Sequence, residues 1–367
     1  MNKYLIITIL GIILLPACSK ETAEKESFTR TILVYLGRDN NLSGSSDDKI
    51  ESMLKGWNGQ NGNLVFYEDK KDSSPCLMEA YREKGINKTR ILETYEEENS
   101  ASSEVFSRVV KLVQSRFPSD SYGLIVFSHA SGWLPESTLT SPRSVIIDGK
   151  AEMDLKDFAN SIPDNSFQFI IFEACFMAGI EVAYELKDKT DYIVSSSAEI
   201  LSPGFRPVYA ETMNKLFSKV PDLQSFIEKV HEYFETQSGA SQSSTLSLIK
   251  TAGLPELKDW VRKNMSTPIS IDPEEIQHFD RYSYRLFFDF EDYFSHAVND
   301  TDKKEELRRL LQTCVIYKAS TPTFMLPYNG FLIEKHSGLT TYIQQNSFPF
   351  LNEEYKKLKW YKDALSI

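Results

Sequence analysis

The middle of the chain reads Tyr122-Gly-Leu-Ile-Val-Phe-Ser128-His129, then Phe167-Gln-Phe-Ile-Ile-Phe-Glu173-Ala174-Cys175, then Asp191-Tyr-Ile-Val-Ser195. Short apolar runs rich in Ile, Val and Phe, separated by segments of helix length, are typical of buried parallel strands. Parallel sheets place reacting groups at the carboxyl ends of their strands. We therefore expect His129 and Cys175, a pair suited to thiol chemistry, to emerge at the same edge of one sheet.

The pattern extends outward from this stretch in both directions. It predicts an α/β fold, with a mostly parallel central sheet flanked by helices and with further helices and strands added at the C-terminal end. The aromatic-rich residues 266–300 fit no single period and stay unassigned. The other predicted strands cover residues 31–36, 63–67, 76–81, 89–93, 145–147, 246–249, 314–318 and 338–343. The predicted helices lie near residues 43–57, 105–113, 155–162, 176–186, 208–218, 222–236, 254–265 and 303–311.

The first residues have the anatomy of an export signal. Residues 1–17 hold one lysine, an apolar run too short to span a bilayer, and the ending Leu15-Pro16-Ala17-Cys18, which resembles a bacterial lipobox. We expect Cys18 to be a lipidated N-terminus and residues 18–28 to be a polar tether, with one domain over residues 29–365. This predicts an exported, membrane-anchored lipoprotein, periplasmic or on the cell surface. The alternative is an ordinary secretion signal with an incidental cysteine.

Charge and cysteine content limit the class of protein. Lys and Arg number 41 against 52 Asp and Glu, so the net charge is −11, which argues against a nucleic-acid partner and permits cationic substrates. Beyond the signal lie Cys76, Cys175 and Cys314, an odd number in an exported protein. We therefore expect no disulfide framework and at least one free thiol. We also expect a monomer.

Cys175 and His129 are the candidate reactive groups. A cysteine attacks a carbonyl as the thiolate, so its pKa of about 8.5 must fall or a base must remove its proton. Cys175 ends a predicted strand and opens the predicted helix 176–186, whose N-terminus would stabilise negative charge. His129 stands at the corresponding end of another strand. The alternative for Cys175 is a role in core packing.

Four segments, taken together and in this order, resemble the clostripain family of cysteine peptidases, and the resemblance extends over nearly the whole chain after residue 31. They are Val34-Tyr35-Leu36 with Asp39-Asn40-Asn41-Leu42, Ser128-His129-Ala130-Ser131-Gly132-Trp133, Glu173-Ala174-Cys175-Phe176-Met177 with Glu181, and His336-Ser337-Gly338-Leu339-Thr340-Thr341-Tyr342.

The resemblance implies a caspase-like fold and cleavage of protein or peptide substrates, usually after Arg or Lys. His129 would be the general base and acid, and Cys175 the nucleophile of an acyl-enzyme. The backbone N–H groups of Cys175 and of Ala130 or Ser131 would form the oxyanion hole.

This chain departs from the family pattern next to the predicted dyad. Ala130 stands where the family commonly has Gly, which could narrow the oxyanion loop. Glu173 stands where the family commonly has Asp. Because alternate strand residues share a face, Glu173 and Cys175 would point the same way. Glu173 is therefore the natural partner for a basic P1 side chain, P1 being the residue before the scissile bond. Glu199 is a second candidate for this pocket, with a solvated loop charge as its alternative.

Family members are often matured by cleavage between the two dyad residues. Arg143 and Lys150 are the basic candidates here, and we expect the loop of residues 131–150 to block the site until it is cut. Some relatives depend on calcium, but the acidic residues near Glu96 and in 289–292 do not follow an EF-hand pattern. The sequence therefore leaves a calcium requirement undecided. No spacing suggests zinc, and we predict no cofactor. The alternative function is an inactive surface lipoprotein that binds peptides, or that binds glycans through the aromatic segment 279–294.

Overall fold

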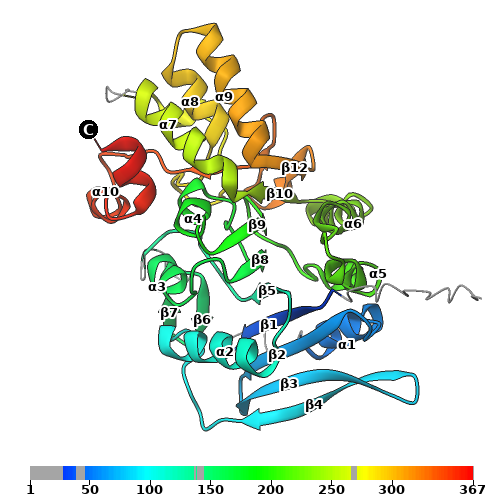
Figure 1. Ribbon diagram of the computed structural model, residues 1–367. Coiled ribbons are helices and arrows are strands. Elements are labelled where there is room, and N and C mark those ends of the chain that lie inside the picture. The colour runs from blue at the N-terminus through cyan, green and yellow to red at the C-terminus, as the bar shows by residue number, and fades with distance from the viewer. Residues whose placement is uncertain (1–27, 39–45, 136–137, 139–143, 266–270, 367) are drawn as a thin grey trace, which may run out of the picture.

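The computed structural model describes residues 28–38, 46–135, 138, 144–265 and 271–366. A nine-stranded sheet runs through its centre in the order β12-β10-β9-β8-β5-β1-β2-β3-β4 (Figure 1). The five middle strands, from β9 to β2, are parallel, and antiparallel strands extend the sheet at both edges. The strands are β1 (Arg30–Arg38), β2 (Gly62–Lys70), β3 (Ser73–Glu83), β4 (Ile86–Thr94), β5 (Ser121–Phe127), β8 (Phe167–Glu173), β9 (Thr190–Ser195), β10 (Thr245–Lys250) and β12 (Val315–Ser320).

Helices cover both faces of this sheet, because successive strand residues point to opposite sides. In β1, Leu33 and Tyr35 pack into one apolar core, whereas Ile32, Val34 and Leu36 pack into the other. The first face carries α2 (Ser103–Arg116), α3 (Leu155–Asn160), α4 (Ile180–Glu185) and α7 (Leu254–Asn264). The second face carries α1 (Ser46–Gly56), α5 (Arg206–Thr212) and α6 (Leu223–Glu235) (Figure 1).

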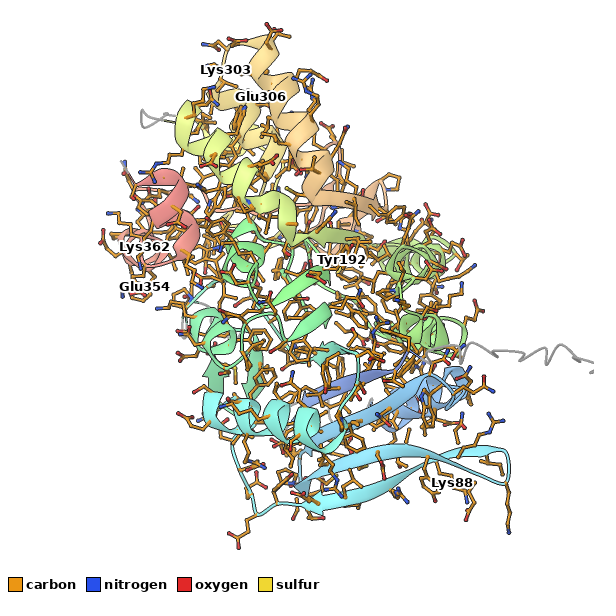
Figure 2. All side chains as sticks on the ribbon, viewed as in Figure 1. Lys88, Tyr192, Lys303, Glu306, Glu354 and Lys362 are labelled. Atoms are coloured by element: carbon orange, nitrogen blue, oxygen red, sulfur yellow. The ribbon has the colours of Figure 1, made fainter. Side chains whose placement is uncertain are left out.

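The C-terminal part adds helices beyond β10 and β12 and small strand pairs. Helices α7, α8 (Phe290–Ala297) and α9 (Thr301–Cys314) gather at one end of the molecule, and the β3–β4 hairpin lies at the other (Figure 1). Figure 2 shows the side chains of Lys303 and Glu306 at the helical end and that of Lys88 on the hairpin. The remaining elements are β6 (Ile146–Asp148), β7 (Ala151–Met153), β11 (Phe288–Asp289), β13 (Thr323–Phe324), β14 (Phe331–Leu332), β15 (Thr340–Thr341) and α10 (Pro349–Tyr355). Short 3-10 turns span Met213–Phe217, Gly239–Ser241, Thr251–Gly253, Pro273–Glu275 and Leu326–Tyr328, and a π-helical turn spans Tyr361–Leu365.

The α/β fold with a central sheet flanked by helices confirms the prediction, and two local predictions are wrong. The helix predicted at 176–186 begins only at Ile180, because turns follow Cys175. The strand predicted at 338–343 shrinks to Thr340–Thr341, which pairs with β11 instead of the main sheet. The strand predicted at 314–318 is present as β12, which begins one residue later because α9 continues through Cys314. None of the helices in the described ranges has the length and apolar character needed to cross a bilayer.

Candidate active site

The strand register brings the two predicted reactive residues to one edge of the sheet. Phe127 at the end of β5 pairs with Glu173 at the end of β8. His129 and Cys175 each follow two residues later, so the backbone segments after β5 and β8 leave the sheet at the same level. Both side chains are partly exposed and line the same cavity of about 590 Å³. The structure therefore brings this predicted pair together at the carboxyl edge of the parallel strands, where α/β sheets bind ligands.

A strained turn presents Cys175. Phe176, the next residue, has a φ of 60°, a left-handed conformation that is uncommon for an aromatic residue. Its N–H donates to the Ala198 carbonyl at 3.0 Å, and its ring stacks on Phe287 with centroids 4.5 Å apart. The Ala178 N–H donates to the Ser196 carbonyl at 3.0 Å. The loop after β9 thus holds the turn, and strain of this kind persists only where the surroundings fix it.

The predicted helix N-terminus does not reach the thiol, because α4 starts at Ile180 and is only 6 residues long. The Ile200 N–H takes its place and donates to the Cys175 Sγ at 3.4 Å. A hydrogen bond to the charged form of a group favours that form, so this donor favours the thiolate. Nothing in the local sequence around Cys175 points to Ile200, which comes from the loop after another strand.

The loop after His129 packs against the turn after Cys175. Ala130 is buried, and its methyl group joins the apolar core. The Ser131 N–H, a predicted oxyanion donor, donates to the Ser144 carbonyl at 2.9 Å in this structure. Gly132 has a φ of +65°, and a Cβ there would lie 2.7 Å from the carbonyl oxygen of Phe176. Only glycine therefore lets the two loops approach this closely.

Glu173 lines the cavity but is bound by the protein itself. Its carboxylate forms an ion pair with Lys49, and the exposed fractions of the two side chains are 1% and 2%. It also accepts hydrogen bonds from the Phe205 N–H and the Tyr209 hydroxyl, each at 2.7 Å. A Cβ at Gly204 would overlap the carboxylate, so glycine makes room for it. The prediction treated Glu173 as open to substrate, whereas its charge is already balanced inside the fold.

The sequence itself carries a signal for a buried role of Lys49. Lys49 is four residues before Met53, so both lie on the same face of α1, and both are buried. A lysine on the apolar face of an amphipathic helix needs a buried partner. Pattern analysis can therefore find the residue, but cannot identify Glu173 as the partner.

The other carboxylates that line the cavity are also paired. Glu199 contacts Arg281, with Oε1 3.0 Å from Nη2, and its Oε2 has no hydrogen-bond partner within the described ranges. Asp48 contacts Arg206 at 2.7 Å. Each of the three carboxylates that line the cavity thus has a cationic partner. The predicted placement of Glu199 beside the reactive pair agrees with the structure, and the solvated alternative does not.

The fourth family-like segment lies directly behind the nucleophile turn. The Thr340 N–H donates to the Ala178 carbonyl at 2.9 Å. The buried carboxyl of Glu181 accepts from the Tyr342 N–H at 2.9 Å and from the Thr341 hydroxyl at 3.0 Å. Burial raises the pKa of Glu181 to about 7. This segment supports the turn that carries Cys175 and does not line the cavity.

Of the predicted processing and anchor residues, Lys150 alone lies within the described ranges. Lys150 is exposed in the turn between β6 and β7, which form an antiparallel hairpin. The Ile147 N–H donates to the Ser128 Oγ at 3.0 Å, so this hairpin is tied to the residue before His129. Within the described part of 131–150, no residue lines the cavity. Arg143 and Cys18 lie outside the described residues.

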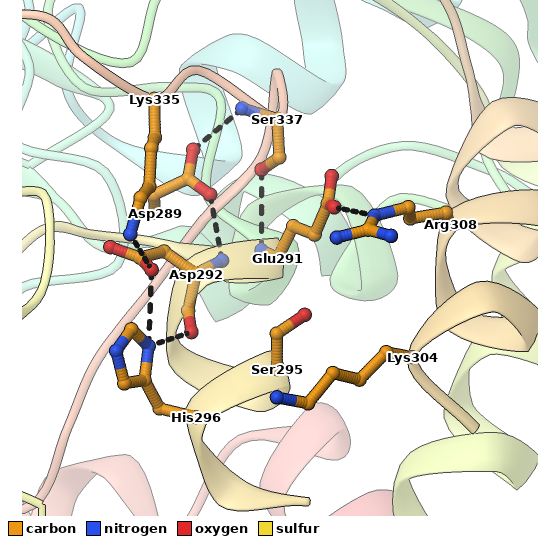
Figure 3. Close-up of a pocket in the computed structure, with 9 residues that line it drawn as sticks. All are labelled: Asp289, Glu291, Asp292, Ser295, His296, Lys304, Arg308, Lys335 and Ser337. Atoms are coloured by element: carbon orange, nitrogen blue, oxygen red, sulfur yellow. Dashed lines mark hydrogen bonds and ion pairs between the residues drawn. The ribbon is translucent and has the colours of Figure 1, made fainter. Parts of the chain in front are cut away.

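A second cavity, of about 400 Å³, lies among charged side chains of the C-terminal part (Figure 3). Asp289 accepts from the Ser337 N–H at 2.6 Å, and burial raises the pKa of its carboxyl to about 6. Asp292 contacts Lys335 at 2.6 Å, and Glu291 contacts Arg308 at 2.8 Å. These contacts join α8 to α9 and to residues 335–337, so the acidic segment 289–292 has protein partners.

Two further observations concern thiols and metals. Burial raises the pKa of Cys76 and Cys314 to about 11, which holds both as thiols, and none of the three cysteines of the described chain forms a disulfide. Within the described ranges, no group of three or more His, Cys, Asp or Glu side chains is arranged to hold a metal ion.

Comparisons with sequence families, with characterised proteins and with solved structures all point to the same family. The sequence model of the clostripain family matches residues 34–341. Clostripain from Hathewaya histolytica is 27% identical over 226 residues, which cover 52% of this chain and 42% of that protein, less than half of its length. An inactive zymogen of a C11 protease from Parabacteroides distasonis is 32% identical and superposes with a TM-score of 0.83, covering 93% of this chain and 99% of its own. A secreted C11 cysteine protease from Bacteroides thetaiotaomicron, in complex with an irreversible peptide inhibitor, is 25% identical with a TM-score of 0.82, covering 92% and 99%.

Proposed function

This chain belongs to the clostripain family of cysteine peptidases, and we propose that it is an endopeptidase whose catalytic dyad is His129 and Cys175. The observation that carries the proposal is the paired ending of β5 and β8, which leads both side chains into one cavity. The Ile200 N–H, which donates to the Cys175 Sγ, supports the nucleophilic role because it favours the thiolate.

The proposed reaction proceeds through an acyl-enzyme. His129 takes the proton of Cys175, and the thiolate sulfur bonds to the scissile carbonyl carbon. The carbonyl oxygen becomes an oxyanion, for which we propose the N–H groups of Cys175 and Ala130 as donors. His129 then gives its proton to the leaving amine as the C–N bond breaks. A water molecule, deprotonated by His129, attacks the thioester and releases Cys175.

We assign a preference for basic P1 side chains, Arg or Lys, to the cavity beside the dyad. Glu199 supports this assignment, since it lines the cavity and, besides the Oε1 that pairs with Arg281, has a buried Oε2 without a hydrogen-bond partner within the described ranges. A carboxylate oxygen in this position suits an ammonium or a guanidinium. Glu173, another of the three carboxylates that line the cavity, is paired with Lys49.

Peptide libraries that vary P1 test the proposal. We expect cleavage after Arg or Lys, and covalent capture of Cys175 by a labelled chloromethyl ketone with a basic P1 group. Peptide mapping of the captured protein identifies the labelled residue. Absence of cleavage at any P1, even after limited proteolysis of the 131–150 loop, would contradict the peptidase function.

We further propose self-processing at Arg143 or Lys150. The exposed turn at Lys150 supports it, as does the hydrogen bond that ties the hairpin to Ser128. We expect the purified protein to yield a fragment that begins at Ser144 or Ala151, and the matching Arg143→Ala or Lys150→Ala variant to lose it. Intact mass and N-terminal sequencing report the cut.

The control for processing is Lys156→Ala, which changes a basic residue inside α3 and should leave the fragments unchanged. Fragments of the same size from Cys175→Ala, purified alone, would show that another protease makes the cut.

For the N-terminal segment we propose export and anchoring through a lipid on Cys18. The run Leu15-Pro16-Ala17-Cys18 supports this proposal, as does a relative that is itself described as secreted. The expected substrates are proteins or peptides outside the cytoplasm.

A further inference from the structure

The floor of the cavity contains a complete cation-binding arrangement that is already occupied. The Lys49 ammonium pairs with the Glu173 carboxylate and lies 4.1 Å from the ring centroid of Phe127 and 5.7 Å from that of Tyr209. A carboxylate combined with aromatic faces is a typical receptor for an ammonium or guanidinium. The protein thus supplies, from its own chain, the cation that such a floor would otherwise take from a substrate.

Lys49 is held in this position by the scaffold. It lies on α1, and the neighbouring Asp48 pairs with Arg206 at 2.7 Å. On the same helix, the Ser52 hydroxyl donates to the Arg206 carbonyl at 2.7 Å. Helix α1 is therefore fixed to α5, the helix that also carries Tyr209. The ammonium belongs to the packed core of the protein.

The Glu173 carboxylate is also saturated by other donors. The Phe205 N–H and the Tyr209 hydroxyl bind it in addition to Lys49. Burial is the main cause that raises the pKa of Tyr209 well above its usual value, and the neighbouring Glu173 raises it further, so the phenol stays a donor. A P1 cation at the floor would meet a carboxylate with three donors and the positive charge of Lys49.

The wall of the cavity offers a different acceptor. Glu199 lies just after β9, pairs with Arg281 through Oε1, and keeps Oε2 without a hydrogen-bond partner within the described ranges. The exposed fraction of its side chain is 11%, against 1% for Glu173. An incoming cation can therefore bind the buried Oε2, unpartnered within the described chain, while Arg281 stays on Oε1, and no buried lysine is displaced.

We propose that Lys49 is a specificity-determining residue, which fills the cation subsite at the cavity floor so that a basic P1 side chain is recognised by Glu199 and not by Glu173. The proposal rests on the peptidase function proposed above. It assigns the choice of P1 to two charges from outside the dyad motifs, Lys49 at the floor and Glu199 at the wall.

Substrate pairs that differ in charge alone at P1 test this assignment. Arg against citrulline, and Lys against 2-aminoheptanoic acid, keep the side-chain length while removing the charge. The readout is the ratio of kcat/KM for the charged peptide to that for the neutral one. Because it removes a positive charge beside an incoming P1 cation, Lys49→Met is expected to raise this ratio by about tenfold or more. Lys49→Arg should keep the wild-type ratio, and Glu199→Gln should lower it.

The double variant Lys49→Met with Glu173→Gln is the decisive control, because it leaves the floor uncharged and orphans no ion. It should retain the wild-type ratio, since Glu199 is intact. If Glu173 itself binds the P1 cation, the double variant loses the preference and the proposal is overturned, even where Lys49→Met alone fails to fold. An unchanged ratio in folded, active Lys49→Met or in Glu199→Gln also overturns it. A wild-type protein that cleaves none of these peptides contradicts the peptidase function instead.

Discussion

The Cys175→Ala variant is expected to lose peptidase activity down to background, a fall of roughly 10⁴-fold or more in kcat/KM, because no other group can form the acyl bond. His129→Ala should lose nearly as much, since the thiol then has no base and the leaving amine no acid. Residues that act as one unit are not additive, so the double variant should be no worse than Cys175→Ala. The measurement is kcat/KM on a peptide with a basic P1 residue.

Cys76→Ala is the matched control for this prediction. Like Cys175, Cys76 is partly exposed and forms no disulfide, but its pKa is raised to about 11 and it lies on β3, away from the cavity lining. It should keep wild-type activity and should still be captured by the affinity label at Cys175. Full activity in Cys175→Ala, or loss of activity in Cys76→Ala, would show that the reactive thiol has been misassigned.

The Glu173→Ala variant is expected to lower the free energy of unfolding by about 3–5 kcal/mol, the usual cost of breaking one side of a buried ion pair. It leaves the Lys49 ammonium buried without its carboxylate, and it orphans the Phe205 N–H and the Tyr209 hydroxyl. Urea unfolding followed by circular dichroism measures the change. A loss this large distinguishes a carboxylate built into the core from one held open for substrate.

Two controls define this effect. Glu83→Ala breaks the exposed pair with Lys88 on the β3–β4 hairpin and should change stability very little, because surface pairs contribute little (Figure 2). Lys49→Met with Glu173→Gln should recover most of the stability lost by Glu173→Ala, since neither partner is then left alone. A Glu173→Ala protein as stable as the wild type would mean that the Lys49 pair is not maintained in solution.

Features that depend on strand pattern could be predicted from the sequence. The near-continuous apolar runs at residues 122–128 and 167–173 indicate burial on both faces, and the ends of such parallel strands meet at one edge. That reasoning leads directly to His129 and Cys175. It also places Glu199, which follows β9, beside them.

Features that depend on tertiary partners could not be predicted. The helix after Cys175 starts late because the Phe176 N–H is taken by Ala198, a contact between segments that are distant in sequence. The donor to the thiol, Ile200, is a backbone group and has no sequence signature. The two-residue strand at Thr340 pairs with β11, although its pattern suggested a longer strand of the main sheet. In each case a contact across the fold overrides local preference.

The contact between Gly132 and Phe176 has a mechanical consequence. The loop that follows β5 contacts the turn that follows β8 backbone to backbone, and no side chain of residue 132 separates them. A shift of either loop is therefore passed to the other, and base and nucleophile keep their separation while the sheet edge fluctuates. The residue at position 132 thus determines the spacing between His129 and Cys175. We expect any side chain there to lower activity before it lowers the stability of the fold.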